Sequence, residues 1–295
     1  MRLQLGQMVR DSLILNLENT FLEEGGYVNV ATGDYGPGAK QLGLLERANN
    51  DPIYGGSRVW QSPFLNFVHE SGTTPPAGFI SPVHISGIWV TGQFKGRTDS
   101  TYPHNIDFAN GRVIFNSNQS TNLEVRMNYS YKEAPVFYAF QDNKLIDQTS
   151  SNINNVGISG INFPSGSIAY LPAVFLQYNS QESNPMQLGG GKFIRYQYAL
   201  HILTDNFDSC DNLSSVIMKQ LDKSLPIIDF RSSPIMFNEY GDKASTYASY
   251  ATLKSNNKLF DARYLEMSSR ATVFNDGIYR TSVFATIEVT RNSII

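Results

Sequence analysis

The clearest pattern in the chain is an alternation of positions that is followed by a helical stripe. Between Lys192 and Thr204, large apolar side chains occupy every second position, Ile194, Tyr196, Tyr198, Leu200 and Ile202. This spacing places them on one face of a strand, because side chains of a strand repeat every second residue. The residues on the other face of this strand, at alternate positions from Phe193 to Leu203, include both apolar and polar side chains. This pattern suits a sheet that carries a helix on one face and another surface on the opposite face.

A helix is expected after a short polar turn at Asp205–Asn206. Apolar residues recur at intervals of three and four, at Leu213, Val216, Ile217, Leu221 and Leu225. This is one stripe of a helix over Asp208–Leu225, with Asp208 or Ser209 as its amino-terminal cap. Pro226 cannot continue a helix. The pattern therefore predicts a long strand, a turn and an amphipathic helix that folds back onto the strand.

The first part of the chain predicts one helix and then a segment rich in glycine and proline. Apolar positions repeat about every four residues over Met8–Glu24, and Gly25-Gly26 can take the left-handed turn that closes many helices. Residues 27–82 show only short apolar pieces between glycines and prolines. Aromatic residues make full disorder unexpected, so we predict ordered loops or a partner-binding arm.

An antiparallel sheet of at least four strands is predicted next. Val83–Val90 has period two, and Ile106–Ala109 and Arg112–Phe115 flank Asn110-Gly111, the strongest signal for a two-residue hairpin turn. Alternation over Leu123–Tyr131 predicts a half-exposed strand.

The second half of the chain is expected to form a further β-rich part. Phe137–Asp147 fits either a short helix or a strand, and the polar run Gln148–Asn155 is the best boundary candidate. The remaining segments are expected to be strands at Ile168–Tyr178, Ile227–Phe230 and Ser282–Thr290, a loop or arm at Asn238–Asn257, and a mixed segment at Leu259–Phe274. We therefore predict an α+β fold with domains at 1–150 and 151–295.

Composition indicates a surface suited to packing against other subunits. Charged residues make up only 17% of the chain, against about 25% in typical proteins, and amide and hydroxyl side chains take their place. The formal net charge is −3, which implies no broad attraction to nucleic acid. Aromatic residues in the two irregular segments are the candidate oligomer interface: Tyr35, Tyr54, Trp60, Phe64, Phe67, Tyr240, Tyr247 and Tyr250.

The sequence offers little catalytic chemistry. Cys210 is the single cysteine, and the four histidines form no close-spaced metal pattern. The triple glycine 189–191 precedes a strand, whereas phosphate-binding loops follow one. No apolar run approaches the ~18 residues of a membrane span, and the amino terminus lacks the profile of a signal peptide. We expect no catalytic residues, no metal, no cofactor and no membrane association.

The order of elements in the carboxy-terminal half resembles tail-terminator, or tail-completion, proteins of tailed bacteriophages. The shared pattern is an early strand, a glycine-led long strand, a polar turn, a helix across the sheet and a late strand, here Leu171–Tyr178, Lys192–Thr204, Asp205–Asn206, Asp208–Leu225 and Ser282–Thr290. The hairpin at 106–115 looks like hairpins of phage neck and tail proteins. The resemblance covers about 130 residues and rests on pattern, with no diagnostic motif.

The resemblance implies a structural virion protein that is assembled in the host cytoplasm. It would form a ring of identical subunits, a hexamer or a dodecamer, at the head–tail junction or the tail end. Its partners would be neighbouring neck and tail proteins, with genome DNA passing through the lumen without sequence-specific binding. The alternative is a glycan- or receptor-binding module of a baseplate or fibre, in which exposed tyrosines such as Tyr247 and Tyr250 stack on sugars. An enzyme has the least support.

Overall fold

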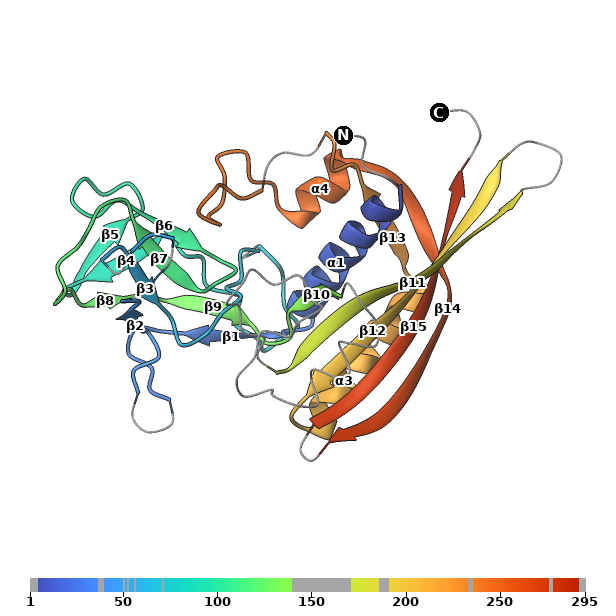
Figure 1. Ribbon diagram of the computed structural model, residues 1–295, viewed down its shortest axis with the longest axis horizontal. Coiled ribbons are helices and arrows are strands. Elements are labelled where there is room, and N and C mark those ends of the chain that lie inside the picture. Colours follow the sequence, from blue (N-terminus) through green and yellow to red (C-terminus); the bar gives the residue numbers. More distant parts are fainter. Residues whose placement is uncertain are drawn as a thin grey trace. The chain divides into compact units, whose positions relative to one another are not determined.

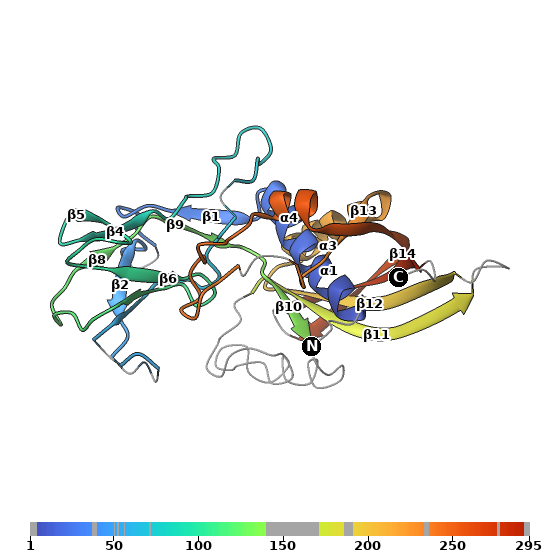
Figure 2. The same cartoon turned by 90° about the horizontal axis from the view of Figure 1, so that it is seen from above.

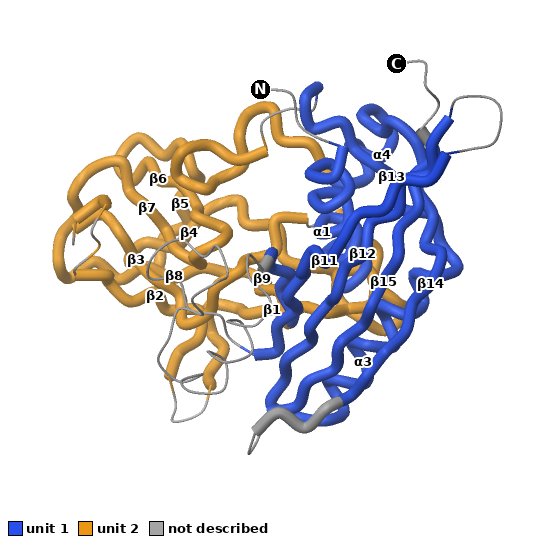
Figure 3. Tube along the Cα trace, turned by 45° about the vertical axis from the view of Figure 1, so that its right-hand side comes forward, with its two compact units in different colours: residues 1–21, 134–233, 250–295 blue, residues 22–133, 234–249 orange. Residues whose placement is uncertain are grey.

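The computed structural model describes residues 5–36, 40–49, 51, 53–55, 57–70, 72–139, 171–185, 191–232, 236–275 and 278–291. The chain divides into two compact units, drawn in separate colours in Figure 3. Unit 1 comprises residues 1–21, 134–233 and 250–295, and unit 2 comprises residues 22–133 and 234–249. These bounds differ from the predicted domains at 1–150 and 151–295, because the chain passes between the units several times. The boundary candidate Gln148–Asn155 lies outside the described residues.

Unit 1 is built on a six-stranded sheet in the order β10-β11-β12-β15-β14-β13 (Figure 1). All neighbours are antiparallel except β10 and β11. Its strands are β10 (Val136–Ala139), β11 (Ala173–Pro185), β12 (Lys192–Thr204), β13 (Ser224–Ile228), β14 (Lys258–Asn275) and β15 (Ile278–Arg291). Its helices are α1 (Leu5–Glu23), α3 (Phe207–Met218) and α4 (Tyr250–Asn256). The fold is α+β and mostly β, as predicted.

The core of unit 1 lies between the sheet and its helices, which cover one face of the sheet in Figure 2. The strand predicted at Lys192–Thr204 is confirmed with the same bounds. Its five alternating apolar residues all pack in this core, together with residues of α1 and α3. The helix predicted over Met8–Glu24 is also confirmed, and Gly25 closes it with a φ of +87°.

The second helix is shorter than predicted. Its cap is Asn206, whose side chain accepts a hydrogen bond from the Ser209 backbone N–H, so the prediction of Asp208 or Ser209 is wrong. The α-helix ends at Met218 and a 3-10 turn, η2, covers Lys219–Asp222. Leu225 and the proline after it belong to β13. Leu225 continues the helical spacing of apolar residues but is buried as part of a strand. The spacing of apolar residues alone therefore could not locate the end of the helix.

Other predicted segments of unit 1 are extended. Phe137–Asp147 begins as strand β10, and its residues after Ala139 lie outside the described part. Of the strand expected at Ile168–Tyr178, residues 168–170 lie outside the described part, and β11 begins at Ala173 and runs on to Pro185. The mixed segment Leu259–Phe274 is part of the 18-residue strand β14. Ser282–Thr290 is confirmed within β15.

Unit 2 holds a seven-stranded sheet in the order β5-β4-β8-β2-β3-β7-β6 and a two-stranded sheet of β1 and β9. The strands are β1 (Tyr27–Val30), β2 (Leu44–Arg47), β3 (Val59–Gln61), β4 (Gly87–Val90), β5 (Gln93–Gly96), β6 (His104–Asp107), β7 (Arg112–Phe115), β8 (Val125–Arg126) and β9 (Tyr129–Lys132). A separate apolar core fills this unit, with Trp60, Phe67 and Phe115 among its largest members.

Three expectations for unit 2 need correction. Residues 27–82 are mostly ordered loops and turns where they are described, as expected, but the short strands β1, β2 and β3 lie within them. The hairpin stems meet at the pair Asp107↔Arg112, so the connection is four residues long rather than two. The Asp107 carboxylate accepts from both the backbone and the side-chain amide of Asn110, which stabilises the longer turn. The run Leu123–Tyr131 divides between β8 in one sheet and β9 in the other.

The segment predicted as a loop or arm, Asn238–Asn257, is divided between the two units. Residues 236–249 pack in unit 2, where Phe237 and Lys243 form a β-bridge and Asp242 is 3% exposed. The Asp242 carboxylate accepts from the Ile106 backbone N–H at 2.9 Å and pairs with Arg97. From Tyr250 onward the chain forms α4 of unit 1. The loop interpretation therefore holds for the first part only.

Candidate assembly interface

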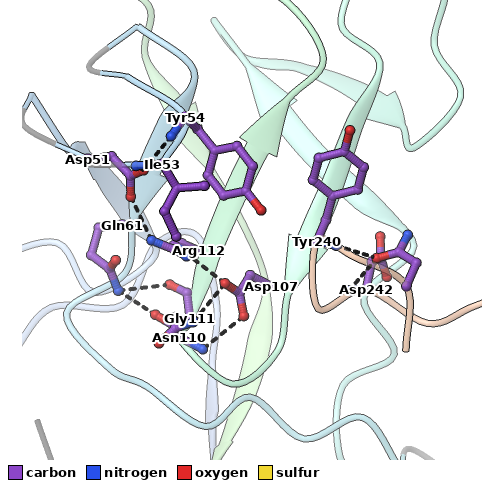
Figure 4. A network of polar contacts seen from close by, with 11 residues as sticks. Asp51, Ile53, Tyr54, Gln61, Asp107, Asn110, Gly111, Arg112, Tyr240 and Asp242 are labelled. Atoms are coloured by element: carbon purple, nitrogen blue, oxygen red, sulfur yellow. Dashed lines mark hydrogen bonds and ion pairs between the residues drawn. The ribbon is translucent and has the colours of Figure 1, made fainter. Parts of the chain in front are cut away.

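The two predicted interface residues Tyr54 and Tyr240 lie together on unit 2. Their ring centroids are 5.8 Å apart, and both side chains are half-buried (Figure 4). Ile53, beside them, is 71% exposed. Burial raises the pKa of the Tyr54 hydroxyl, so this group is neutral at physiological pH. Rings of this kind supply large contact area with few rotatable bonds, which is typical of anchor residues in protein interfaces.

A buried ion network holds this patch in place. Arg112 Nη1 donates to Asp51 Oδ2 at 2.7 Å, and Arg112 Nε donates to Asp107 Oδ2 at 2.8 Å (Figure 4). Both carboxylate side chains are at most 6% exposed. Asp51 also accepts from the backbone N–H groups of Ile53 and Tyr54, so the loop that presents them is tied to β7. The loop that carries Tyr54 is therefore held to the sheet by these bonds, and such preorganisation lowers the entropy lost on binding a partner.

The other predicted interface residues are dispersed. Trp60 and Phe67 are each 1% exposed and belong to the core of unit 2, so they present no surface to a second molecule. Phe64 stacks on Tyr131 with 4.1 Å between centroids. Tyr35 is 61% exposed, and its hydroxyl accepts from Gln41. Patterns of aromatic residues do not separate core from surface, because both environments favour them.

Tyr250 and Tyr247 make internal hydrogen bonds in different units. The Tyr250 hydroxyl donates to Asn16 at 2.9 Å inside unit 1, and this side chain is 6% exposed. The Tyr247 hydroxyl donates to Glu70 and lies 3.0 Å from His69 Nδ1 in unit 2. The glycan alternative was based on these two tyrosines, and both hydroxyls already bind groups of the same chain.

The cluster around Tyr247 is a buried polar clasp that the sequence did not indicate. His69 and Glu70 are each 8% exposed, and the Lys243 ammonium lies 4.8 Å from the Tyr247 ring centroid. Burial holds the pKa of His69 well below its ordinary value and lowers the pKa of Lys243. The histidine is thus neutral at pH 7. His69 and Tyr247 are 178 residues apart, so no local pattern could have joined them. The clasp fastens residues 236–249 to the body of unit 2.

Unit 1 carries a second candidate surface, the two outer edges of its sheet. Strand β10 pairs with β11 only at Val174–Gln177, and β13 pairs with β14 only at Lys258–Arg263. Among the described residues, no strand pairs with the outer edge of Tyr178–Pro185 or with that of Tyr264–Asn275. An open edge presents backbone N–H and C=O groups that can pair with another chain. Figure 3 shows β11, β12, β15 and β14 side by side between these edges.

Chemical sites of other kinds are not found in the described part. No group of three histidine, cysteine or carboxylate side chains there is placed to hold a metal ion. None of its helices combines the length and apolar character that crossing a membrane requires. Cys210 is buried beside Thr281, with 3.3 Å between Sγ and Oγ1. The residues with marked shifts of pKa are buried structural groups, His69 and His201 foremost among the histidines.

No protein-family model matches the sequence, and no curated protein is similar to it.

Proposed function

We propose that this chain is a structural subunit that binds copies of itself head to tail and closes into a ring in the neck or tail of a tailed bacteriophage. The observation that carries the proposal is a pair of edges on one sheet that no strand covers within the described part of the chain. One is formed by Tyr178–Pro185 of β11 and the other by Tyr264–Asn275 of β14. They lie at opposite edges of the sheet, so pairing the β11 edge of one copy with the β14 edge of another is a heterologous contact. Such a contact repeats around an axis and can close a ring.

The strand directions suit this pairing. The pairs β11·β12, β12·β15 and β15·β14 are all antiparallel, so β11 and β14 run in opposite directions. When β14 of one copy is placed beside β11 of the next in a continuous sheet, these two strands are antiparallel as well. Each added copy thereby extends one antiparallel sheet through main-chain hydrogen bonds, which is how strand addition joins chains.

The offset between the open stretches also suits a closed ring. Tyr178 is in register with Tyr198 of β12, then Ala285 of β15 and Met267 of β14. The open part of β11 extends from this level toward one end of the strands, and most of the open part of β14 extends toward the other. Neighbouring copies must therefore be displaced along the strands. Closed sheets need such a stagger, because their strands tilt relative to the axis of closure.

The phage assignment is supported by the resemblance to tail-terminator proteins, of which the long strand and the helix after it are present here as β12 and α3. The Tyr54–Tyr240 patch offers unit 2 an anchor for a neighbouring subunit or another neck or tail protein. A net charge of −3 suits a lumen through which DNA passes without being held. Mass spectrometry of purified particles tests this assignment, and absence of the chain from infectious particles would refute it.

Cross-linking tests whether the two edges meet. Ser183→Cys lies in the open stretch of β11 and Ser269→Cys in that of β14, and both serines are exposed. Cys210 is buried and does not compete for reagent. A flexible bifunctional maleimide should convert the double variant into a ladder of covalent oligomers, whereas each single variant should give no ladder. The matched control pairs Ser269→Cys with Ser245→Cys, an exposed serine of unit 2. A ladder in the control, or none in the double variant, would contradict edge-to-edge pairing.

A further inference from the structure

Unit 1 contains a pocket beside the open stretch of β11. Its volume is about 270 Å³, and it is lined by the first turns of α1, the end of β10 and the adjoining parts of β11 and β12. Pockets for drug-sized ligands occupy about 300–1,000 Å³, so this one is sized for a single small ring. The residues that define its chemistry are Gln7, Arg10, Tyr138, Tyr178, Gln181 and Tyr198.

Aromatic rings form the walls of the pocket. Tyr178 and Tyr198 meet edge to face with 5.9 Å between centroids. Tyr198 is buried, whereas Tyr178 is 39% exposed and forms the outer wall. The third ring, Tyr138, lies under the Arg10 guanidinium, which is 4.5 Å from its centroid. The faces of aromatic rings carry partial negative charge, and they attract the weakly positive C–H groups of a saturated ring.

The polar groups of the pocket suit a neutral ligand that both donates and accepts hydrogen bonds. Arg10 is the one charged side chain in the lining, and it is paired with Asp11 through Nε at 2.7 Å and Nη2 at 2.6 Å. This pairing offsets the charge and fixes the plane of the guanidinium. The amides of Gln7 and Gln181 each carry a donor and an acceptor, and so does the hydroxyl of Tyr178. Hydroxyl groups are the ligand groups that match such a lining.

We propose that this pocket binds one neutral sugar ring, either free or as the terminal unit of a glycan. C–H faces of the sugar would lie against Tyr178, and its hydroxyls would bond Gln181 and the α1 groups. The site is distinct from Tyr247 and Tyr250. It lies in unit 1 alone, although Tyr178 and Gln181 of its lining also belong to the edge that the proposed ring uses.

Ligand-observed NMR with methyl glycosides of glucose, galactose, mannose and N-acetylglucosamine tests the proposal. A glycan array in parallel separates a free sugar from a terminal unit. We expect at least one neutral glycoside to bind, and Tyr178→Ala to weaken it about tenfold, or about 1.4 kcal/mol. Tyr178→Phe should keep most of the affinity, because the ring face remains. The matched control is Phe284→Ala, which removes a 42% exposed ring from β15 outside the pocket and should change nothing.

Several results would overturn the proposal. They are no binding of any neutral glycoside, equal losses in Tyr178→Ala and Phe284→Ala, or preferential binding of glucuronate in place of the neutral sugars. Because Tyr178 and Gln181 also belong to the open stretch of β11, the assay includes Ser269→Lys, a variant designed to leave that edge unpaired. Binding by this variant supports the sugar site whether or not the wild-type ring covers it. Failure of the site and failure of the ring are thus separate outcomes.

Discussion

His201 is a buried histidine of unit 1 whose protonation should destabilise the fold. It lies in β12, is 5% exposed, and bonds side chains of both neighbouring strands. Its Nε2 is 2.7 Å from Gln177 Oε1, and its Nδ1 is 3.0 Å from Arg280 Nη2. A guanidinium can only donate, so Nδ1 must accept and Nε2 carries the proton. A second proton would have to enter at Nδ1, against the positive charge of Arg280.

Burial, and then the charge of Arg280, lower the pKa of His201 from 6.5 to about 4. The unfolded chain therefore binds a proton near pH 6.5, whereas the folded chain binds it only near pH 4. Stability is lost as pH falls through this window, because the unfolded state then holds more protons. This lowering of the His201 pKa corresponds to a loss of about 3 kcal/mol in the free energy of unfolding across the window, at ~1.4 kcal/mol per pH unit.

The assay is an NMR titration of the imidazole C–H signals. The chain has four histidines, and His201→Gln identifies the signal of interest by its absence. We expect a titration midpoint near pH 4. Hydrogen exchange of unit 1 peptides should show wild type losing protection between pH 6.5 and 4, with a smaller loss in His201→Gln. A midpoint near 6.5, or the same pH dependence in both proteins, would contradict a lowered pKa of His201.

Three further predictions concern unit 2, whose unfolding in urea can be followed by fluorescence because both tryptophans lie there. Arg112→Met should lower the free energy of unfolding by about 3–5 kcal/mol, because it leaves two buried carboxylates without their shared partner. A decrease below ~1 kcal/mol would contradict a stabilising role of this ion network. Tyr247→Phe should lower the free energy of unfolding by about 1–3 kcal/mol, because Glu70 and His69 lose the hydroxyl to which they are bonded. An unchanged free energy of unfolding would show that these bonds do not stabilise unit 2. Gly111→Ala should destabilise more than Gly92→Ala by ~1 kcal/mol or more. Both glycines have positive φ, but an added Cβ would lie 2.0 Å from the Phe64 carbonyl oxygen at the first and meets open space at the second. Equal losses would exclude that close approach.

The sequence predicted the centre of unit 1 better than its borders. Strand β12 was found with its full bounds because it pairs on both sides and buries one continuous face. Strand β14 was missed, although it is longer. Its register shifts at Tyr264/Glu266 and Val273/Asn275, and each shift exchanges the faces of the residues that follow. A period of two is therefore broken inside one strand.

The candidate interface was predictable in part. Tyr54 and Tyr240 were chosen as interface residues, and the structure brings them together, although their role in assembly stays a prediction. Trp60 was also predicted to be an interface residue because it is aromatic, but it lies in the core of unit 2. Alternation around β3 was too short to show which face it buries, since this strand has three residues. The open edges could not be foreseen, because they depend on which residues of β11 and β14 the described strands β10 and β13 pair with.

Native mass spectrometry of the wild-type chain beside Ser269→Lys tests self-association through the sheet edges most directly. A lysine in the open stretch of β14 should block pairing, as charged residues do on natural edge strands. Ser245→Lys, on an exposed loop of unit 2, is the matched control. Wild type and Ser245→Lys should each give one closed oligomer, expected to be a hexamer or a dodecamer, and Ser269→Lys should give monomers. A monomeric wild type, or full assembly of Ser269→Lys, would contradict the account.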